Sequence, residues 1–173
     1  MKVEEKLAAL GLPLRDLELH YRTNPSGARY TSHVVHRDVL YLSGTTPVKE
    51  GSAYLPGLVG RDLTVEEGYE AARYAMLMSL GVLAYALGDL DRVVQALQLT
   101  GFVNSAPGFG DQPRVVNGAS DLLVELYGER GRPTRAAIGC QGLAGNASVE
   151  VVLTVVFDGG PVRPSIPRDR HQR

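Results

Sequence analysis

Residues 64–88, TVEEGYEAARYAMLMSLGVLAYALG, decide the fold because they predict one long buried helix. The Thr64 hydroxyl can accept a hydrogen bond from the amide three residues on, and the Glu67 carboxylate can reach back, which together make a capping box. Gly88 suits the end of the helix. Apolar side chains recur between these ends at spacings of three and four: Tyr69, Ala72, Met76, Leu80, Leu83 and Leu87. This stripe gives the helix one buried side.

The segments around this helix predict five strands and a second main helix. Strands are expected over residues 28–35, 38–43, 93–103, 134–141 and 148–157, with the last two forming a hairpin. Pro113 suits the first turn of the second helix and Gly128 its end. The order β-β-α-β-α-β-β predicts a single α+β domain over residues 1–158, with one mixed sheet and two main helices on one face. In strand 93–103 the residues expected to share a face are Val93, Gln95, Leu97, Leu99, Gly101 and Val103.

The remaining segments predict little regular structure. Residues 2–10 are typical of a short helix, 18–24 of an extended segment, and the cluster 24–27 (NPSG) of a turn. Residues 44–60 are expected to form a loop. The tail 159–173, GGPVRPSIPRDRHQR, is rich in proline and arginine and is expected to be disordered.

The last strand indicates that one sheet face needs a partner. Its alternate residues from Val149 to Phe157 are all apolar and are expected to pack under the two helices. The opposite face carries Glu150 but also Val152 and Val156, and exposed apolar patches usually mark interfaces. We therefore expect self-association through this face. The alternative is that the tail or the N-terminal segment covers it.

Charge and composition disfavour several classes of partner. The chain has 173 residues, a formal net charge of −1 and 6% aromatic residues without tryptophan. Proteins that bind nucleic acid or membrane surfaces normally carry a basic excess, so neither partner is expected. The N-terminus does not follow a signal-peptide pattern, and the longest uncharged apolar stretch is too short to span a bilayer, so a cytoplasmic location is expected.

Cysteine and histidine do not favour metal or nucleophile chemistry. Cys140 is the one cysteine, and a small strand residue is the favoured interpretation. His33 and His36 are three residues apart without a further ligand nearby, which favours two half-exposed strand histidines over a metal site. No metal or organic cofactor is expected.

Four segments in collinear order resemble the Rid family, the reactive intermediate deaminases, which is also called the YjgF family. They are residues 41–47 (YLSGTTP), 116–120 (VNGAS), and 132–135 (RPTR) followed by 148–151 (SVEV). The resemblance covers roughly residues 28–157. The long capped helix together with residues 100–107 and 117–124 resembles a longer-chain branch of the family.

The resemblance implies a chorismate mutase-like fold and a homotrimer with a cleft at each subunit interface. In the deaminating members an arginine holds the substrate carboxylate and a glutamate positions a water. Arg135 matches the first of these catalytic positions and Glu150 the second. Four positions match other substrate-binding residues: Tyr30, Ser43, Asn117 and Ala137, of which Ala137 stands where many deaminating members have a small residue or cysteine.

Two functions follow as expectations. The first is hydrolytic deamination of small enamine or imine carboxylates, similar to 2-aminoacrylate or 2-aminomuconate, to keto acids and ammonia. The second is a non-catalytic module that binds a small carboxylate such as a keto acid, in which Arg135 matters for binding and Glu150 is only structural. The alternative to a functional role for the two residues is a plain cross-strand pair of Arg135 and Glu150. Ribonuclease activity, which has been attached to this family, is disfavoured by the near-neutral charge and the few aromatic residues.

Overall fold

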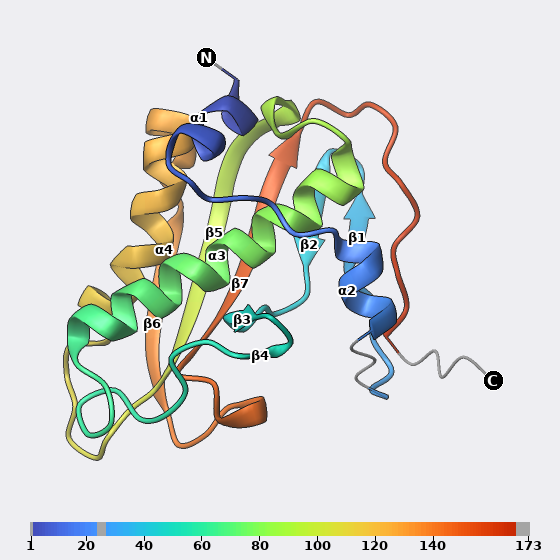
Figure 1. Ribbon diagram of the computed structural model, residues 1–173. Coiled ribbons are helices and arrows are strands. Elements are labelled where there is room, and N and C mark those ends of the chain that lie inside the picture. Colours follow the sequence, from blue (N-terminus) through green and yellow to red (C-terminus); the bar gives the residue numbers. More distant parts are fainter. Residues whose placement is uncertain (1, 24–26, 169–173) are drawn as a thin grey trace.

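The computed structural model describes residues 2–23 and 27–168. These residues form four α-helices and seven strands (Figure 1). In chain order they are α1 (Val3–Ala9), α2 (Leu17–Thr23), β1 (His33–His36), β2 (Val39–Leu42), β3 (Val48–Lys49), β4 (Ser52–Ala53), α3 (Val65–Leu87), β5 (Val93–Asn104), α4 (Gln112–Tyr127), β6 (Thr134–Cys140) and β7 (Val149–Phe157). The expected α+β class with one mixed main sheet is confirmed.

The main sheet has the order β1-β2-β7-β5-β6. Strands β5 and β6 are parallel, and the other neighbouring strands are antiparallel. The expected hairpin of the last two strands is wrong, because β7 lies between β2 and β5 while β6 forms the edge. The reason is visible in the sequence: β7 is apolar on nearly every residue, and such a strand belongs in the middle of a sheet.

Helices α3 and α4 cover one face of the sheet, and Figure 1 shows α3 crossing in front of β5 and β7. The predicted caps of α3 are present. The Thr64 hydroxyl accepts a hydrogen bond from the Glu67 amide at 3.1 Å, the Glu67 carboxylate accepts one from the Thr64 amide at 2.8 Å, and Gly88 ends the helix with a φ of 79°. Helix α4 starts with Pro113 in its first turn and ends before Gly128, as predicted.

Strand β5 departs from the predicted alternation. Its register with β7 shifts between Val93 and Gln95 and again between Ala96 and Gln98. Each irregularity changes which residues face the helices. Ala96 is therefore buried, whereas Leu97, which was expected to share a face with the buried Leu99, is 37% exposed.

Two terminal segments are more ordered than expected. Residues 17–23 form helix α2 instead of an extended segment, and Leu17 is buried in the core. Of the expected turn at 24–27, residues 24–26 lie outside the described residues. The tail expected to be disordered is a packed segment as far as Arg168, and residues 169–173 lie outside the described residues. We call residues 158–168 the C-terminal strap.

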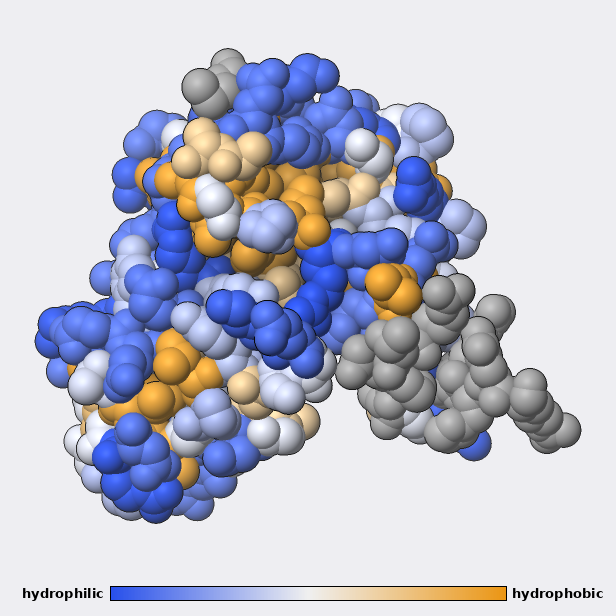
Figure 2. All heavy atoms as spheres, viewed as in Figure 1, coloured by the Kyte–Doolittle hydropathy of each residue, from blue (hydrophilic) through white to orange (hydrophobic). Residues whose placement is uncertain are grey.

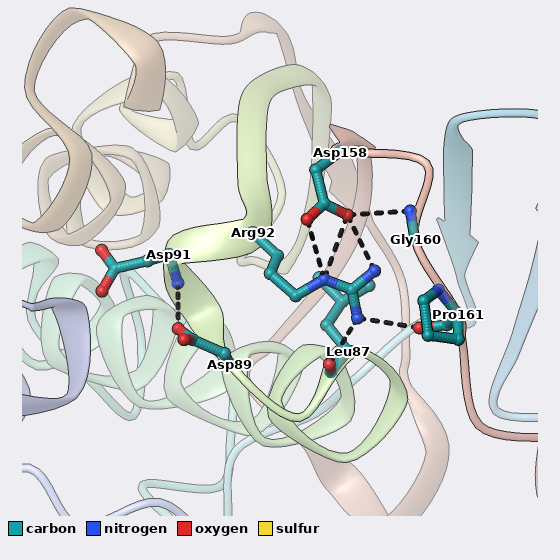
Figure 3. A network of polar contacts seen from close by, with 7 residues as sticks. All are labelled: Leu87, Asp89, Asp91, Arg92, Asp158, Gly160 and Pro161. Carbon is teal, nitrogen blue, oxygen red and sulfur yellow. Dashed lines mark hydrogen bonds and ion pairs between the residues drawn. The ribbon is translucent and has the colours of Figure 1, made fainter.

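A polar network at Arg92 fixes the start of the strap (Figure 3). The Arg92 guanidinium donates to both carboxylate oxygens of Asp158, to the Leu87 carbonyl at 2.6 Å and to the Pro161 carbonyl at 2.8 Å. The Gly160 amide donates to the same Asp158 carboxylate. One arginine thus links the end of α3 to the first turn of the strap.

The rest of the strap runs beside β1 and ends near α2 (Figure 1). The Ile166 amide donates to the Ser32 hydroxyl, and the Ser32 amide donates back to the Ile166 carbonyl, both at 3.0 Å. The Arg168 amide donates to the Tyr30 carbonyl at 2.8 Å. These hydrogen bonds explain why a proline-rich sequence is ordered: its backbone groups pair with the segment before β1.

Candidate functional site

Arg135 lies on the edge strand β6, on the side of the sheet that carries the helices. Its Cα pairs with that of Leu99, which is fully buried under the helices. One terminal nitrogen of its guanidinium, Nη1, donates to the Asn117 side-chain oxygen at 2.7 Å and to the Ser120 hydroxyl at 2.8 Å, both on α4. These two bonds fix the guanidinium plane, and the residue stays exposed. Among the described residues no carboxylate pairs with it.

Glu150 lies on the opposite face of the sheet. Its neighbours Val149 and Val151 are fully buried under the helices, so alternation along β7 directs Glu150 to the other side. The carboxylate packs over Gly44, where a Cβ atom would overlap its Oε1 oxygen. No hydrogen bond or ion pair to this carboxylate is found in the described part of the chain. Partial burial raises the pKa of Glu150, because the charged form loses solvation.

Ser43 directly precedes Gly44 in the chain, and Tyr30 lies near Gly44 because both line one cavity. The Ser43 hydroxyl donates to the Thr31 carbonyl at 2.5 Å, which leaves its oxygen free to accept from a ligand. The Tyr30 ring is 42% exposed, and its hydroxyl accepts a hydrogen bond from Arg168 Nε at 3.3 Å.

The predicted residues therefore fall into two groups within one chain. The first group, which we call the arginine cluster, is Arg135, Asn117, Ser120 and Ala137 at the β6 edge. The second, the glutamate cluster, is Glu150, Ser43, Gly44 and Tyr30. The alternative of a plain cross-strand pair of Arg135 and Glu150 is wrong, because β5 separates their strands and the two side chains lie on opposite faces. One cluster offers a rigid cation, and the other a half-buried base.

Sequence reasoning missed two members of these clusters. Ser120 lies three residues after Asn117 on a helix, and residues at that spacing share a face, so it could have been found from the predicted helix. Gly44 follows directly after a strand, and a glycine there often marks a close approach of another group. That group is the Glu150 carboxylate.

The other candidate residues have structural surroundings. His33 is not half-exposed as expected but buried. Its ring nitrogens lie within hydrogen-bond distance of the Ser32 hydroxyl at 2.9 Å and the Arg163 carbonyl at 3.1 Å, and burial lowers its pKa. In the described part of the chain, the one group of three potential metal-ligating residues is Glu4, Asp89 and Asp91. Their oxygens already serve the chain, since Glu4 accepts from the Leu90 amide and Asp89 from the Asp91 amide.

The helix side of the molecule is mostly hydrophilic, with smaller apolar areas between the charged groups (Figure 2). None of the described helices is both long and apolar enough to cross a membrane.

A family model described as "YjgF/chorismate mutase-like, putative endoribonuclease" matches residues 4–155. Among characterised sequences, Protein TCP17 of Trypanosoma cruzi is 43% identical over 123 residues, which is 70% of this chain and 77% of that protein.

Solved structures agree with this match. The protein Atu1372 of Agrobacterium tumefaciens, described as of unknown function, superposes with a TM-score of 0.82 at 37% identity, covering 90% of this chain and 92% of that one. A protein of Shewanella oneidensis described as a putative endoribonuclease has a TM-score of 0.83 at 31% identity, covering 91% and 100%. NMB1025 of Neisseria meningitidis, a member of the YjgF protein family, shares the fold at 18% identity and a TM-score of 0.52, covering 79% and 96%.

Proposed function

This chain belongs to the YjgF/chorismate mutase-like family, and from that premise we propose that it deaminates small enamine or imine carboxylates by hydrolysis. The substrates are 2-aminoacrylate- or 2-aminomuconate-like acids, and the products are a keto acid and ammonia. The observation that carries the proposal is the state of Arg135 and Glu150. Arg135 is exposed and Glu150 is partly buried, and neither is neutralised by an oppositely charged group in the described part of the chain.

The arginine cluster suits a substrate carboxylate. Asn117 and Ser120 occupy one terminal nitrogen of the Arg135 guanidinium and hold its plane. The remaining N–H groups can grip a carboxylate through two parallel hydrogen bonds, which a lysine could not reproduce. Ala137 lies two residues on, on the same face of β6, and its small side chain leaves room for the body of the substrate.

The glutamate cluster suits proton transfer to and from water. An enamine tautomerises to an imine, and water then adds to the imine carbon as Glu150 takes one of the water protons. That proton passes to the imine nitrogen and gives a carbinolamine. Glu150 then takes the hydroxyl proton of the carbinolamine as the carbonyl forms and the C–N bond breaks, and the departing nitrogen receives this proton, so that ammonia and a keto acid result. The raised pKa of Glu150 brings the carboxylate closer to the operating pH, where general acid–base catalysis is most efficient.

A complete site needs two copies of the chain. Because the two clusters lie on opposite faces of one sheet, a single protomer does not present both to one substrate. We propose a homotrimer in which the arginine cluster of one protomer meets the glutamate cluster of the next. Substrate held between them would be shielded from bulk water and correctly oriented, and positioning can supply most of the acceleration.

The test generates 2-aminoacrylate with a dehydratase and follows keto-acid release, with 2-aminomuconate as a second substrate. We expect Glu150→Gln to lower kcat by about 100-fold or more, because it removes the general base. Arg135→Lys should mainly raise KM, by about 10-fold or more, because the bidentate grip is lost. Glu129→Gln and Arg132→Lys, which remove or alter an exposed ion pair on the preceding segment, are matched controls that should leave turnover unchanged. Absence of acceleration over buffer for both substrates would sink the proposal.

The alternative is a non-catalytic keto-acid binding module, which the exposed and oriented Arg135 alone would support. Calorimetry with a keto acid separates the two functions. A pure binding module binds the keto acid, loses affinity in Arg135→Lys, and shows no change in any measurable behaviour in Glu150→Gln. A deaminase loses turnover in Glu150→Gln even where product binding survives.

A further inference from the structure

The cavity that Tyr30 and Gly44 line has a volume of about 210 Å³ and lies between α2, α3 and the end of the C-terminal strap, and Arg135 is not among its lining residues. Its apolar wall includes Leu17, Met78 and Val82, and two tyrosine rings, Tyr21 and Tyr30, complete it. Val48 adds a further apolar residue, and the remaining lining residues are polar, small or basic: Arg15, His20, Gly44, Thr45, Thr46, Gly51, Gly81 and Arg168. At about 30 Å³ per water molecule, the volume corresponds to roughly seven waters, which fits a small molecule.

The charged side chains lining this cavity are both arginines. Arg15 precedes α2 and is held by two contacts: Nη2 donates to the Val48 carbonyl at 2.6 Å, and Nη1 lies 3.0 Å from His20 Nδ1. Arg168 is only 8% exposed, and its guanidinium lies 3.8 Å from the centre of the Tyr21 ring. None of the described lining residues is aspartate or glutamate. The nearby Asp16 and Glu18 are exposed on α2 and do not line the cavity.

His20 adds a neutral polar group to the two cations. A guanidinium can only donate, so His20 Nδ1 accepts from Arg15 and the ring proton is on Nε2. Burial and the positive charges of Arg15 and Arg168 lower the pKa of His20 to about 4, so the ring is neutral at physiological pH. The cavity thus presents hydrogen-bond donors and positive charge together with apolar surface.

We propose that this cavity binds a small organic anion, whose carboxylate or phosphate group is held by Arg15 and Arg168 and whose apolar body rests against Met78 and Val82. Planar guanidinium groups recognise both anionic groups through paired hydrogen bonds. The proposal goes beyond the proposed deamination, because the anion is held by Arg15 and Arg168, which belong to neither cluster, although Tyr30 and Gly44 of the glutamate cluster line the same cavity. Arg168 also lies outside residues 4–155, which the family model matches.

The strap explains how the cavity is built. Pairing of the strap with the segment before β1 places Arg168 beside Tyr30, with the Arg168 amide bound to the Tyr30 carbonyl. Gly44 lines the cavity from one side and lies under the Glu150 carboxylate on the other. An anion in the cavity therefore sits behind the wall on which the glutamate cluster is built.

The test is a ¹⁵N NMR titration of the whole protein with two separate probes, inorganic phosphate and isobutyrate. We expect saturable shifts of the Gly44 and Gly81 amides with at least one probe, and the tighter probe identifies the anionic group that the site prefers. Arg15→Gln and Arg168→Gln should each weaken binding at least ten-fold. Arg135→Lys, which alters only the arginine cluster, should bind the probe within two-fold of the parent protein.

Two outcomes would overturn the proposal. One is the absence of saturable shifts at Gly44 and Gly81 with either probe up to about 50 mM, a concentration that would nearly saturate a site with a Kd of about 1 mM. The other is undiminished binding in the Arg15→Gln, Arg168→Gln double variant. Should Arg168→Gln disturb the strap, Arg168→Lys keeps the charge and loses the planar fork. It should bind the probe more weakly than the parent, and equal binding would also count against the site.

Discussion

At the scale of single residues, the Glu150 carboxylate is the charged group of the proposed site with the least favourable surroundings. A partly buried carboxylate without a hydrogen-bond donor loses solvation and gains little in return. Proteins keep such groups where a perturbed pKa serves a reaction. The same feature affects folding, because a group whose pKa differs between folded and unfolded chains makes stability depend on pH.

Glu150→Gln should therefore raise the melting temperature at neutral pH. The folded-state pKa of Glu150 is raised above its ordinary value of 4.5. Its contribution to stability is fully present below pH 4.5, where both states hold a neutral carboxyl, and is lost as the pH rises through the folded-state pKa. The gain from Glu150→Gln should vanish at acidic pH. Thermal unfolding followed by circular dichroism across this pH range tests the expectation, and Glu129→Gln, which removes an exposed carboxylate, is the control. A gain that persists unchanged at acidic pH would contradict it.

At the scale of elements, the close approach of α3 and α4 requires a glycine at position 118. A Cβ at Gly118 would overlap the Tyr69 carbonyl of α3, so the two helices approach backbone to backbone at this point. Gly81 on α3 is different, because a Cβ there would meet only the Arg15 backbone at 3.5 Å and 3.9 Å, which is ordinary contact. Both glycines lie inside helices, where alanine is intrinsically the better residue.

Gly118→Ala should destabilise the fold by about 1–3 kcal/mol, because overpacking outweighs the gain in helix propensity. The matched Gly81→Ala should instead stabilise it by about 0.5–1 kcal/mol. Urea unfolding of both variants measures these changes. If both substitutions shift the midpoint in the same direction, the account of the helix crossing is wrong.

Sequence patterns predict elements well where one local signal decides. The capping box at Thr64, the glycine end at Gly88 and Pro113 in the first turn of α4 are all local, and each predicted boundary is within two residues of the structure. The strand order is not local. No sequence signal between residues 141 and 148 indicates that the chain passes β5 before β7 pairs. That strand order depends on which strand removes the most apolar surface from water in the middle of the sheet.

The strap shows that composition alone does not predict whether a segment is disordered. Its prolines and arginines are typical of disordered segments. However, Arg92, Ser32 and Tyr30 all supply partners from elsewhere in the chain, and the strap residues make ordered contacts with them. Compositional reasoning about the tail could not detect partners that are 60 to 140 residues away in sequence.

At the scale of the whole molecule, residue types and spacing indicate the candidate site but not how it is assembled. The expectation that Arg135 and Glu150 are neighbours depended on the hairpin that does not form. In the proposed homotrimer, their separation onto two faces would give each protomer one half of two different sites. The sheet face that holds Glu150 also bears exposed apolar residues: Val34 at 56%, Tyr41 at 48% and Ile138 at 44%. Ile138 and Glu150 pair with the same residue of β5, Phe102.

This face should therefore be buried between copies of the chain. Light scattering after gel filtration should give three times the 18.6 kDa of one chain for the parent protein. Ile138→Asp should shift the mass towards that of a monomer, because an unpaired carboxylate buried in an interface costs several kcal/mol. Leu10→Asp is the matched control: Leu10 is 39% exposed just after α1 and on neither cluster, so its replacement should leave the mass unchanged.

Deaminase activity should fall with the trimer fraction in Ile138→Asp, since each half-site loses its complement. A parent protein that is monomeric at micromolar concentration and still turns over 2-aminoacrylate would refute the composite site, because one chain holds the two clusters on opposite faces of its sheet.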